Sequence, residues 1–233
     1  SCSMTPQQAK LYSEIRDHYR AQVLSRVEEK GLAQSKMHVL EGLLRLRQVA
    51  CHPKLVGGNG QYESGKLQEL RERITAVVGS GHKALVFSQF TRFLRLIKDM
   101  LESEGIAYCS LDGRTPAKRR QERVARFQDV DGPPVFTISL KAGGTGLNLT
   151  AADYVFIADP WWNPAVEMQA VDRTHRIGQD KTVFTYRFVT EGTVEEKIRT
   201  LQNQKQELVQ SVLSGSKGVL KDLSREDLEV LLS

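Results

Sequence analysis

The spacing of apolar residues along the chain changes near residue 60. Before that point, apolar side chains recur every fourth position from Leu11 to Val27, and a second amphipathic stretch covers Met37–Ala50. This period is typical of helices that bury one face. We therefore predict that residues 1–60 form a helical unit.

The ends of these helices are marked by local signals. Residues Thr5–Gln8 predict a capping box, with Pro6 at the first helical position. Pro53 ends the second helix, because the residue before a proline avoids the helical region. The residues from Val56 to Ser64 are predicted to form a loop.

Short apolar runs alternate with helical periods in the rest of the chain. The predicted strands are Lys83–Ser88, Ile106–Leu111, Val135–Ser139, Tyr154–Ala158 and Val183–Val189. The predicted helices are Phe93–Leu101, Thr115–Phe127, Pro164–His175 and a long one that starts at the capping box Thr193–Glu196. Repeated β-α-β units with short loops indicate an α/β fold with a doubly wound, mostly parallel sheet. Ligands of such sheets bind beyond the carboxyl ends of the strands.

Composition sets the limits of the interpretation. The chain has 233 residues, enough for one α/β domain with an appendage, and 33 Lys and Arg against 28 Asp and Glu give a net charge of +5. This balance leans toward a polyanionic partner without establishing one. The cysteines have no CxxC spacing, so we expect no metal site, and no apolar run approaches the length of a membrane span. The chain begins with Ser1, which suggests a piece of a longer protein.

One phosphate-loop pattern is rejected. Residues Gly60–Lys66 match GxxxxGK, but Leu67 stands where a hydroxyl would hold Mg²⁺, and no strand leads into the segment. We predict a turn there, with Ser64 capping the next helix. No DExH or DExD sequence supplies a carboxylate for Mg²⁺, so this chain alone is expected not to hold Mg-ATP productively.

A glycine-rich segment, Ser139–Leu149, follows a predicted strand. Glycines allow positive φ and close backbone approach, and Lys and Thr side chains donate to phosphate oxygens. The residues concerned are Lys141, Gly143, Gly144, Thr145 and Gly146. The segment is not a dinucleotide fingerprint, because the third glycine would fall on Leu149. Taken alone, it fits a phosphate site and a plain tight turn equally well.

The segment Trp161–Gln179 carries two arginines, Arg173 and Arg176, at a spacing that places them on one face of a helix near its end. Their fixed charges and planar forks suit a phosphate group, and beside a γ-phosphate they would stabilise the transition state. The alternative is a solvated helix end, where arginine also favours the dipole. Of the adjacent Trp161 and Trp162, we predict that at least one packs in the core and that the other can stack on a sugar or base.

These motifs together resemble the C-terminal motor lobe of the Swi/Snf-type ATPases of helicase superfamily two. The resemblance covers nearly the whole chain. It rests on Leu46–Pro53, Ser64–Leu67, Leu85–Phe90, Leu111–Gly113, Ser139–Thr150 and Gln169–Gln179. The sequence DPWWNPAVE most resembles that of bacterial members and of the Rad5-like group. The resemblance implies a RecA-like lobe at residues 61–215, a helical protrusion at 1–60 and a brace or tail at 216–233.

The resemblance also implies roles for individual residues. Arg173 and Arg176 would be arginine fingers that reach ATP. The positions near the nucleotide would be Gly144, Gly146, Asn148 and Gln169. The positions along the DNA backbone would be Ser88, Gln89, Arg114, Lys141, Ala142, Gly143, Thr145 and Trp162.

The implied function is that of half of an ATP-dependent translocase on double-stranded DNA. ATP and Mg²⁺ would be held mainly by an N-terminal RecA-like lobe of the same protein, and a DNA-bound protein or the transcription or repair machinery would be the cargo. No membrane partner is expected. The implied location is the bacterial cytoplasm or nucleoid, or the nucleus of a eukaryote. An RNA helicase lobe and a non-catalytic RecA-like scaffold that binds nucleic acid remain as alternatives.

Overall fold

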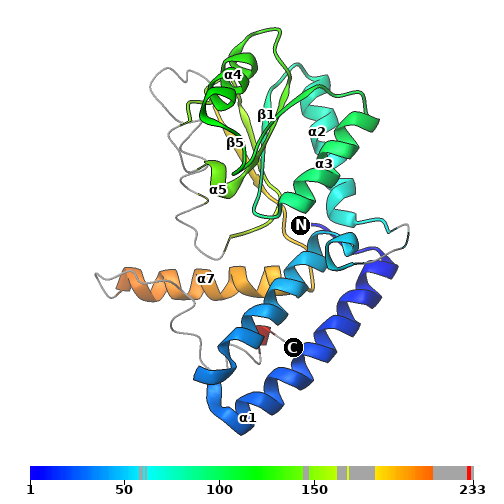
Figure 1. The fold of residues 1–233 in the computed structure, drawn as a ribbon, viewed down its shortest axis with the longest axis vertical. Coiled ribbons are helices and arrows are strands. Elements are labelled where there is room, and N and C mark those ends of the chain that lie inside the picture. Colours follow the sequence, from blue (N-terminus) through cyan, green and yellow to red (C-terminus); the bar gives the residue numbers. More distant parts are fainter. Residues whose placement is uncertain are drawn as a thin grey trace. The chain divides into compact units, whose positions relative to one another are not determined.

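The computed structural model describes residues 1–57, 60, 62–143, 147–161, 167, 182–211 and 230–231 (Figure 1). At positions 30, 32, 33, 36, 141 and 203–211 it describes the backbone only. The chain forms two compact units, residues 67–188 and residues 1–66 with 189–233. The predicted domain boundaries after residues 60 and 215 remain a prediction. The helix predicted at 164–175 and most of the predicted tail at 216–233 lie outside the described residues.

The unit of residues 67–188 is built on a five-stranded sheet in which every pairing is parallel. The strands follow the order β2-β3-β1-β4-β5 across the sheet. Their bounds are β1 (Ala84–Ser88), β2 (Tyr108–Leu111), β3 (Val135–Ser139), β4 (Tyr154–Ile157) and β5 (Phe184–Arg187). All five predicted strands are present, and the predicted doubly wound parallel sheet is confirmed.

Helices cover both faces of this sheet. Figure 1 shows α2 and α3 on one side and α4 and α5 on the other. The bounds are α2 (Gly65–Gly79), α3 (Thr91–Ser103), α4 (Ala117–Gln128) and α5 (Leu140–Gly143). The alternation of sides follows from the strand order, because the chain moves outward from β1 to β2 and then returns to β3. The helix predicted to follow Ser64 is α2, although its end was not predicted; α5, a single turn that opens the glycine-rich segment, was not predicted.

One part of the core lies between the sheet and α4, and the buried side chains of α3 form another on the opposite face. Strands β1 and β3 are buried at every position, as expected for central strands covered on both faces. Phe127 of α4 packs on Phe136 of β3 with 5.2 Å between ring centroids. Trp161 packs against the edge of this core, which confirms the prediction that one of the two tryptophans is a packing residue.

The unit of residues 1–66 and 189–233 contains helix α1 (Pro6–Cys51), a 3₁₀ turn η1 (Pro53–Val56) and helix α7 (Val194–Ser211). Gly31 has φ of 74°, which interrupts α1 and divides it into two helical arms. These arms correspond to the two helices predicted from the sequence. The arms lie side by side in Figure 1, and the ring of Tyr19 fills the space above Gly42. A Cβ added to Gly42 would lie 3.0 Å from that ring, so glycine allows this close approach.

Of the two hydrogen bonds expected from the capping box at the start of α1, one is present. Thr5 is the N-cap and accepts a hydrogen bond from the amide of Gln8, as a capping box requires. The side chain of Gln8 does not reach back to Thr5. It is buried and donates to the carbonyls of Val49 and Ala50 at 2.9 and 3.1 Å. Gln8 therefore joins the start of the first arm to the end of the second, a pairing over 41 positions that local spacing does not reveal.

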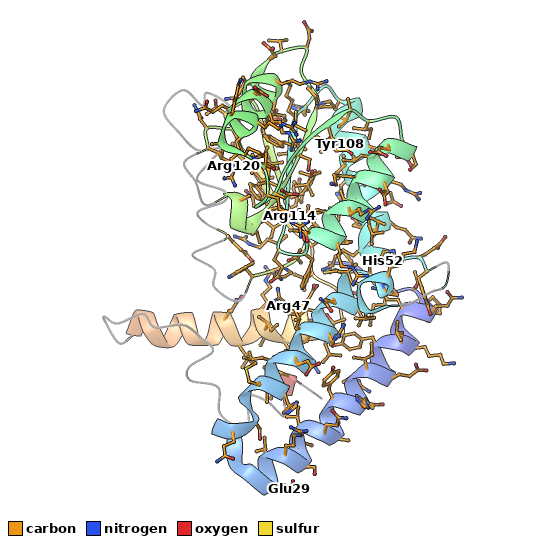
Figure 2. The ribbon with its side chains drawn as sticks, in the orientation of Figure 1. Glu29, Arg47, His52, Tyr108, Arg114 and Arg120 are labelled. Atoms are coloured by element: carbon orange, nitrogen blue, oxygen red, sulfur yellow. The ribbon has the colours of Figure 1, made fainter. Side chains whose placement is uncertain are left out.

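The end of α1 confirms the effect of Pro53. The helix stops at Cys51, and the His52 side chain accepts a hydrogen bond from the amide of Lys54 at 3.1 Å. His52 is 3% exposed, and its position is labelled in Figure 2. Burial, with a smaller contribution from the charge of Lys54, lowers the pKa of His52 from 6.5 to about 4. His52 is therefore a neutral acceptor at neutral pH.

Helix α7 begins against α1. The amide of Val194 donates to the phenolic oxygen of Tyr12 at 2.7 Å. Tyr12 is buried, which raises the pKa of its phenol to about 12. The capping residue Thr193 accepts from the amide of Glu195, and the carboxylate of Glu196 accepts from Gly192. No helix within the described residues is both long enough and apolar enough to cross a bilayer.

Candidate functional site

The rejected phosphate loop is an internal structural element. The ammonium group of Lys66 forms an ion pair with Glu195 at 2.5 Å, and both side chains have no exposed surface. Glu195 also accepts a hydrogen bond from the amide of Thr190. A lysine held this way is not directed at a phosphate in solvent. The residues at this GxxxxGK match therefore do not form a binding site for a nucleoside triphosphate.

The two residues before Lys66 have equally specific structural roles. The hydroxyl of Ser64 donates to the carbonyl of Cys51 at 2.6 Å. A Cβ on Gly65 would lie 1.8 Å from the carbonyl oxygen of Ser3, a distance that no side chain can occupy. The Ser-Gly-Lys sequence therefore joins the start of the chain, the end of α1 and the start of α7 within one unit.

The carboxyl ends of the parallel strands bring most of the described candidate residues to one edge of the sheet. Ser88 ends β1 and lies opposite Ser139, which ends β3. Beyond β4 comes Asp159, a fully buried carboxylate. Its Oδ2 accepts a short hydrogen bond from the hydroxyl of Ser88, and its Oδ1 accepts from the amide of Gln89 at 3.1 Å.

This arrangement fixes the turn after β1. The Ser88 hydroxyl also accepts from the amide of Phe90 at 3.0 Å, so the side chain points into the protein. Gln89 is the half-buried residue that the turn presents next. The contacts of Ser88 and Gln89 with DNA remain a prediction, and within the protein Ser88 acts as the support of the turn.

Arg114 lies in a tight turn after β2 and is exposed (Figure 2). Asp112 shapes this turn by accepting hydrogen bonds from the amide of Arg114 at 2.9 Å and from the hydroxyl of Thr115 at 3.2 Å. Burial alone would raise the pKa of Asp112, but these two hydrogen bonds, together with the nearby charges of Lys98 and Arg114, lower the pKa below its usual value. In this turn the ionised carboxylate of Asp112 is hydrogen-bonded within the protein, and the guanidinium group of Arg114 is exposed to solvent.

The residues after β3 continue the same edge. Lys141, Ala142 and Gly143 belong to the single turn α5. The side chain of Ala142 is buried in the core, and the backbone alone is described at Lys141. The hydroxyl of Ser139, at the start of this segment, is buried and has no hydrogen-bond partner among the described residues.

Asn148 is held outward between two buried neighbours. Leu147 and Leu149 are in the core, whereas Asn148 is exposed. The following residues are fixed by Gln128 of α4, which accepts from the amide of Ala151 at 2.8 Å and donates to the Thr150 hydroxyl. A hollow of about 720 Å³ opens beside Asn148, and α4 forms its other wall. Arg120, which donates to the carbonyl of Thr115, lines it (Figure 2).

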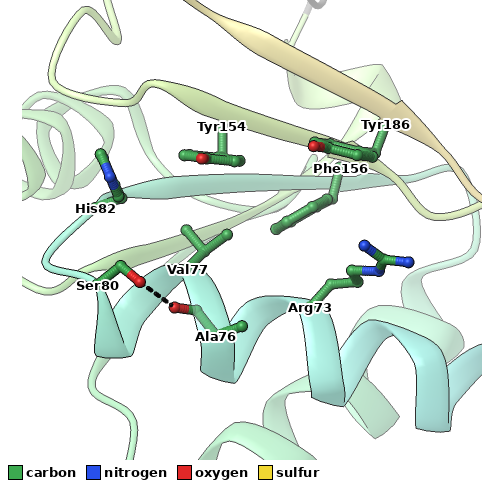
Figure 3. A pocket seen from close by; sticks show the side chains of 8 residues that line it. All are labelled: Arg73, Ala76, Val77, Ser80, His82, Tyr154, Phe156 and Tyr186. Carbon is green, nitrogen blue, oxygen red and sulfur yellow. Dashed lines mark hydrogen bonds between the residues drawn. The ribbon is translucent and has the colours of Figure 1, made fainter.

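A second hollow lies on the opposite face of the sheet, between α2 and the outer strands, with a volume of about 250 Å³ (Figure 3). The rings of Tyr154, Phe156 and Tyr186 form one wall, and Arg73 and His82 lie at its ends. His82 precedes β1 and pairs with Asp153, which precedes β4, at 2.5 Å. This hollow thus extends to the amino ends of these strands and is separate from the carboxyl edge.

The remaining candidate residues lie outside the described part of the chain. They are Gly144, Thr145, Gly146, Trp162, Gln169, Arg173 and Arg176. Their roles stay predictions. Among the described residues, no group of three or more His, Cys, Asp or Glu side chains could hold a metal ion.

Two site-forming carboxylates were missed by sequence reasoning. Asp159 follows β4 directly, and its position one step beyond the strand could have pointed to it. Glu167 lies within the segment singled out for its arginines and is almost fully buried. Neither carboxylate belongs to a charge pattern along the chain. Asp159 is hydrogen-bonded to residues at the end of β1, and Glu167 forms an ion pair with Arg187 of β5.

A parallel RecA-like sheet with these loops along its carboxyl edge defines a helicase-type lobe. Residues 65–178 match the model of the helicase conserved C-terminal domain. The C-terminal domain of a Sulfolobus solfataricus SWI2/SNF2 ATPase has 30% sequence identity and a TM-score of 0.78, and the match covers 99% of this chain and 94% of that domain. The chain therefore belongs to the Swi2/Snf2 family of ATPases and is the C-terminal lobe of such a protein.

Further relatives agree with this assignment. The Sulfolobus solfataricus SWI2/SNF2 ATPase core in complex with double-stranded DNA has 31% identity and a TM-score of 0.82, covering 99% of this chain and 48% of that one. An uncharacterized ATP-dependent helicase of Mycoplasma pneumoniae is 38% identical over 226 residues, which is 97% of this chain and 21% of the relative. The DNA repair protein RAD5B of Arabidopsis thaliana is 42% identical over 171 residues, 72% of this chain and 13% of the relative. The chain thus spans about a fifth or less of these two curated relatives.

Proposed function

We propose that this chain is the C-terminal motor lobe of an ATP-dependent translocase on double-stranded DNA. In this proposal the carboxyl edge of the sheet holds phosphates of the DNA backbone. Arg173 and Arg176 reach ATP with Mg²⁺, which are bound mainly by an N-terminal RecA-like lobe outside this sequence. The proposed mechanism alternates closing of the two lobes on ATP with their release after hydrolysis.

The observation that supports this proposal most directly is the shared edge of the sheet. Residues after β1, β2 and β3 reach the same side because the strands are parallel, and they include the exposed cation Arg114. The similarity to a Swi2/Snf2 core that was solved with double-stranded DNA supports duplex DNA as the partner. Contacts to phosphates carry no sequence information, which suits a motor that moves along any sequence.

The share of the chemistry that falls to this lobe is limited. Lys66 is buried against Glu195 and takes no part in holding phosphates. The contribution left to the lobe is the arginine pair, because guanidinium forks stabilise the charge that develops on a transferred phosphoryl group. Hydrolysis therefore requires both lobes, and the 233-residue chain alone is expected to be inactive.

The test uses the full-length protein, with ATP hydrolysis measured in the presence of duplex DNA. The Arg176→Ala substitution is expected to lower kcat by about 10³-fold or more, while ATP binding is retained. Arg73→Gln is the matched control, because Arg73 is an exposed arginine of α2 that pairs with Glu69. Hydrolysis at the normal rate in the Arg176→Ala protein would overturn the finger assignment.

A second measurement separates DNA from the alternatives. Duplex DNA is expected to stimulate hydrolysis more strongly than RNA, and Arg114→Gln is expected to reduce the slope of log affinity against log salt by about 0.9. Stronger stimulation by RNA would favour an RNA helicase lobe. An unchanged salt slope in the Arg114→Gln protein would remove Arg114 from the contact surface.

A further inference from the structure

The positive charge of the chain is concentrated in a segment that begins at Arg114 and runs through most of α4. Residues 114–126 contain six Lys and Arg side chains and one acidic side chain, Glu122. The chain has 33 Lys and Arg and 28 Asp and Glu in all, so the other residues hold 27 of each kind. The whole net charge of +5 therefore resides in this segment, and the remainder of the chain is neutral.

Three of these cations share one side of α4. Arg119, Arg123 and Arg126 are spaced i, i+4 and i+7, which places them on one helix face. Arg119 and Arg126 are exposed. Arg123 is half-buried, and its guanidinium group donates to the carbonyl of Ser110 in β2, which stands at one end of the strand order β2-β3-β1-β4-β5. This basic stripe of three arginines therefore lies along the β2 margin of the sheet.

The electrostatics of β2 agree with this placement. Cys109 of β2 is buried, which raises the pKa of its thiol. The charges of Arg126, Arg123 and Lys83 act on this pKa in the opposite direction. Lys83 lies at the far end of α4, where its ammonium group donates to the carbonyl of Phe127 at 2.8 Å. The cations are therefore gathered near one strand and are not spread around the helix.

The arrangement is unfavourable for the helix itself. Like charges at i, i+4, such as those of Arg119 and Arg123, repel each other. The first turn of α4 has no acidic residue and carries basic ones, although the helix dipole favours acidic residues there. Within the part of the chain that the structure describes, none of the three stripe arginines forms an ion pair with a carboxylate. Bound phosphate groups would offset this repulsion, because guanidinium groups form strong and often bidentate hydrogen bonds to phosphate.

Duplex DNA is the polyanion that the position of the stripe favours. Arg114, a residue of the proposed DNA track, lies in the turn that leads from β2 into α4. The stripe therefore continues the track past the β2 end of the carboxyl edge. Arg119 and Arg126 are about 10.5 Å apart along the helix axis, and a strand of B-DNA has one phosphate about every 3.4 Å along its own axis. The stripe is thus long enough to face about three phosphates of a strand.

We propose that the β2 side of α4 is a second contact surface for the DNA backbone, outside the track at the carboxyl ends of the strands. Arg119, Arg123 and Arg126 hold phosphates of the duplex where it extends beyond β2. The surface takes no part in ATP hydrolysis; it adds affinity that is independent of sequence and weakens with salt. The inference rests on the proposed function, because the track is what brings the duplex to this side of the lobe.

The test measures binding of a fluorescein-labelled duplex to the full-length protein by fluorescence anisotropy at several salt concentrations. The stripe variant combines Arg119→Gln with Arg126→Gln, whereas Arg123 is kept because it supports β2. Each lost phosphate contact lowers the magnitude of the slope of log affinity against log salt by about 0.9, so we expect a decrease of about 1.8. Between about 50 and 200 mM salt, the loss of affinity is then about 10-fold smaller than in the unmodified protein.

The matched control combines Arg71→Gln with Arg95→Gln, which removes two exposed arginines of α2 and α3 from the opposite face of the sheet (Figure 1). It changes the net charge by the same amount, and its salt slope is expected to stay normal. Arg119→Lys with Arg126→Lys keeps the two charges and is expected to restore most of the slope. An equal decrease in the stripe variant and in the control would show a general effect of net charge and would overturn the proposal.

Two further measurements separate this surface from the proposed track. At saturating duplex DNA, the kcat of ATP hydrolysis by the stripe variant is expected to stay within about twofold of normal, and a larger loss would place these arginines in the hydrolysis machinery and overturn the proposal. A reduced slope in the Arg114→Gln protein with a normal slope in the stripe variant would retain the track and overturn the second surface. No binding of duplex DNA by the unmodified protein would overturn both.

An acidic protein segment is the competing occupant of the stripe, and polyglutamate serves as its probe. We expect polyglutamate to bind the unmodified protein and the stripe variant with the same low affinity. Tighter binding of polyglutamate to the unmodified protein, together with an unchanged salt slope for DNA in the stripe variant, would assign the stripe to an acidic protein segment and overturn the proposal.

Discussion

The ammonium group of Lys66 and the carboxylate of Glu195 lie 2.5 Å apart with no solvent access to either side chain. The two residues are 129 positions apart in the sequence and belong to the same compact unit. Cys51 lies beside them, with its sulfur 3.6 Å from Glu195. A lysine in a GxxxxGK pattern thus serves as the internal ion-pair partner of Glu195 at the start of α7.

We expect Lys66→Met to lower the free energy of unfolding by about 3 to 5 kcal/mol, because it leaves a buried carboxylate without its cation. The measurement is urea unfolding of the 233-residue chain followed by circular dichroism. The control Arg73→Gln breaks an exposed pair and is expected to cost no more than about 1 kcal/mol. An unchanged unfolding midpoint for Lys66→Met would contradict the structural role of the pair.

We expect the stability of the chain to fall as the pH is lowered from 6.5 toward 4, with a contribution from His52. The pKa of His52 is about 4 in the folded chain and near 6.5 when unfolded, so between these values the unfolded state binds more protons. The slope from this residue reaches about 1.4 kcal/mol per pH unit. Stability is therefore retained above pH 6.5 and lost below it.

The measurement for His52 is the thermal midpoint at several pH values. The His52→Gln substitution keeps an acceptor for the amide of Lys54 but does not titrate, so it is expected to flatten the curve between pH 4 and 6.5. His18 is exposed, and His18→Gln provides the control. A pH dependence in the His52→Gln protein as steep as in the unmodified chain would refute this assignment.

We expect Asp159→Ala to destabilise the lobe by about 1 to 3 kcal/mol, because it removes the acceptor of the Ser88 hydroxyl and the Gln89 amide. If the proposed DNA track is right, the affinity for duplex DNA falls as well, since the turn after β1 loses its support. Unfolding and fluorescence anisotropy with labelled DNA measure the two effects. Asp131→Ala, at an exposed position, is the control, and equal behaviour of both variants would count against the role of Asp159.

The apolar pattern was sufficient to predict the sheet. β1 and β3 are mostly apolar and buried at every position because helices cover both faces, and β3 has the predicted bounds. Helix α2 was harder to recognise from the sequence. Its first turn contains Lys66, a charged residue that is fully buried, so the usual polar-outside pattern fails at its start.

The contacts that build the candidate site could be predicted only in part. The parallel topology places the ends of β1, β2 and β3 at one edge, and the candidates after these strands were named from the sequence. The contacts of Asp159 and Glu167 depend on which strands are neighbours, and those of Gln8 depend on the pairing of the two arms of α1. The strand order β2-β3-β1-β4-β5 is a property of the folded chain and is not encoded in any local spacing.

The break at Gly31 gives helix α1 a point where new material can be attached. The position has φ of 74°, so an ordinary side chain would be strained there, although an added Cβ would meet no atom of the described residues within 4 Å. A fluorophore or an affinity tag therefore belongs in a short glycine-rich insertion at this bend, with Gly31 retained. A single-cysteine label in place of Gly31 would strain the bend that it is meant to report on.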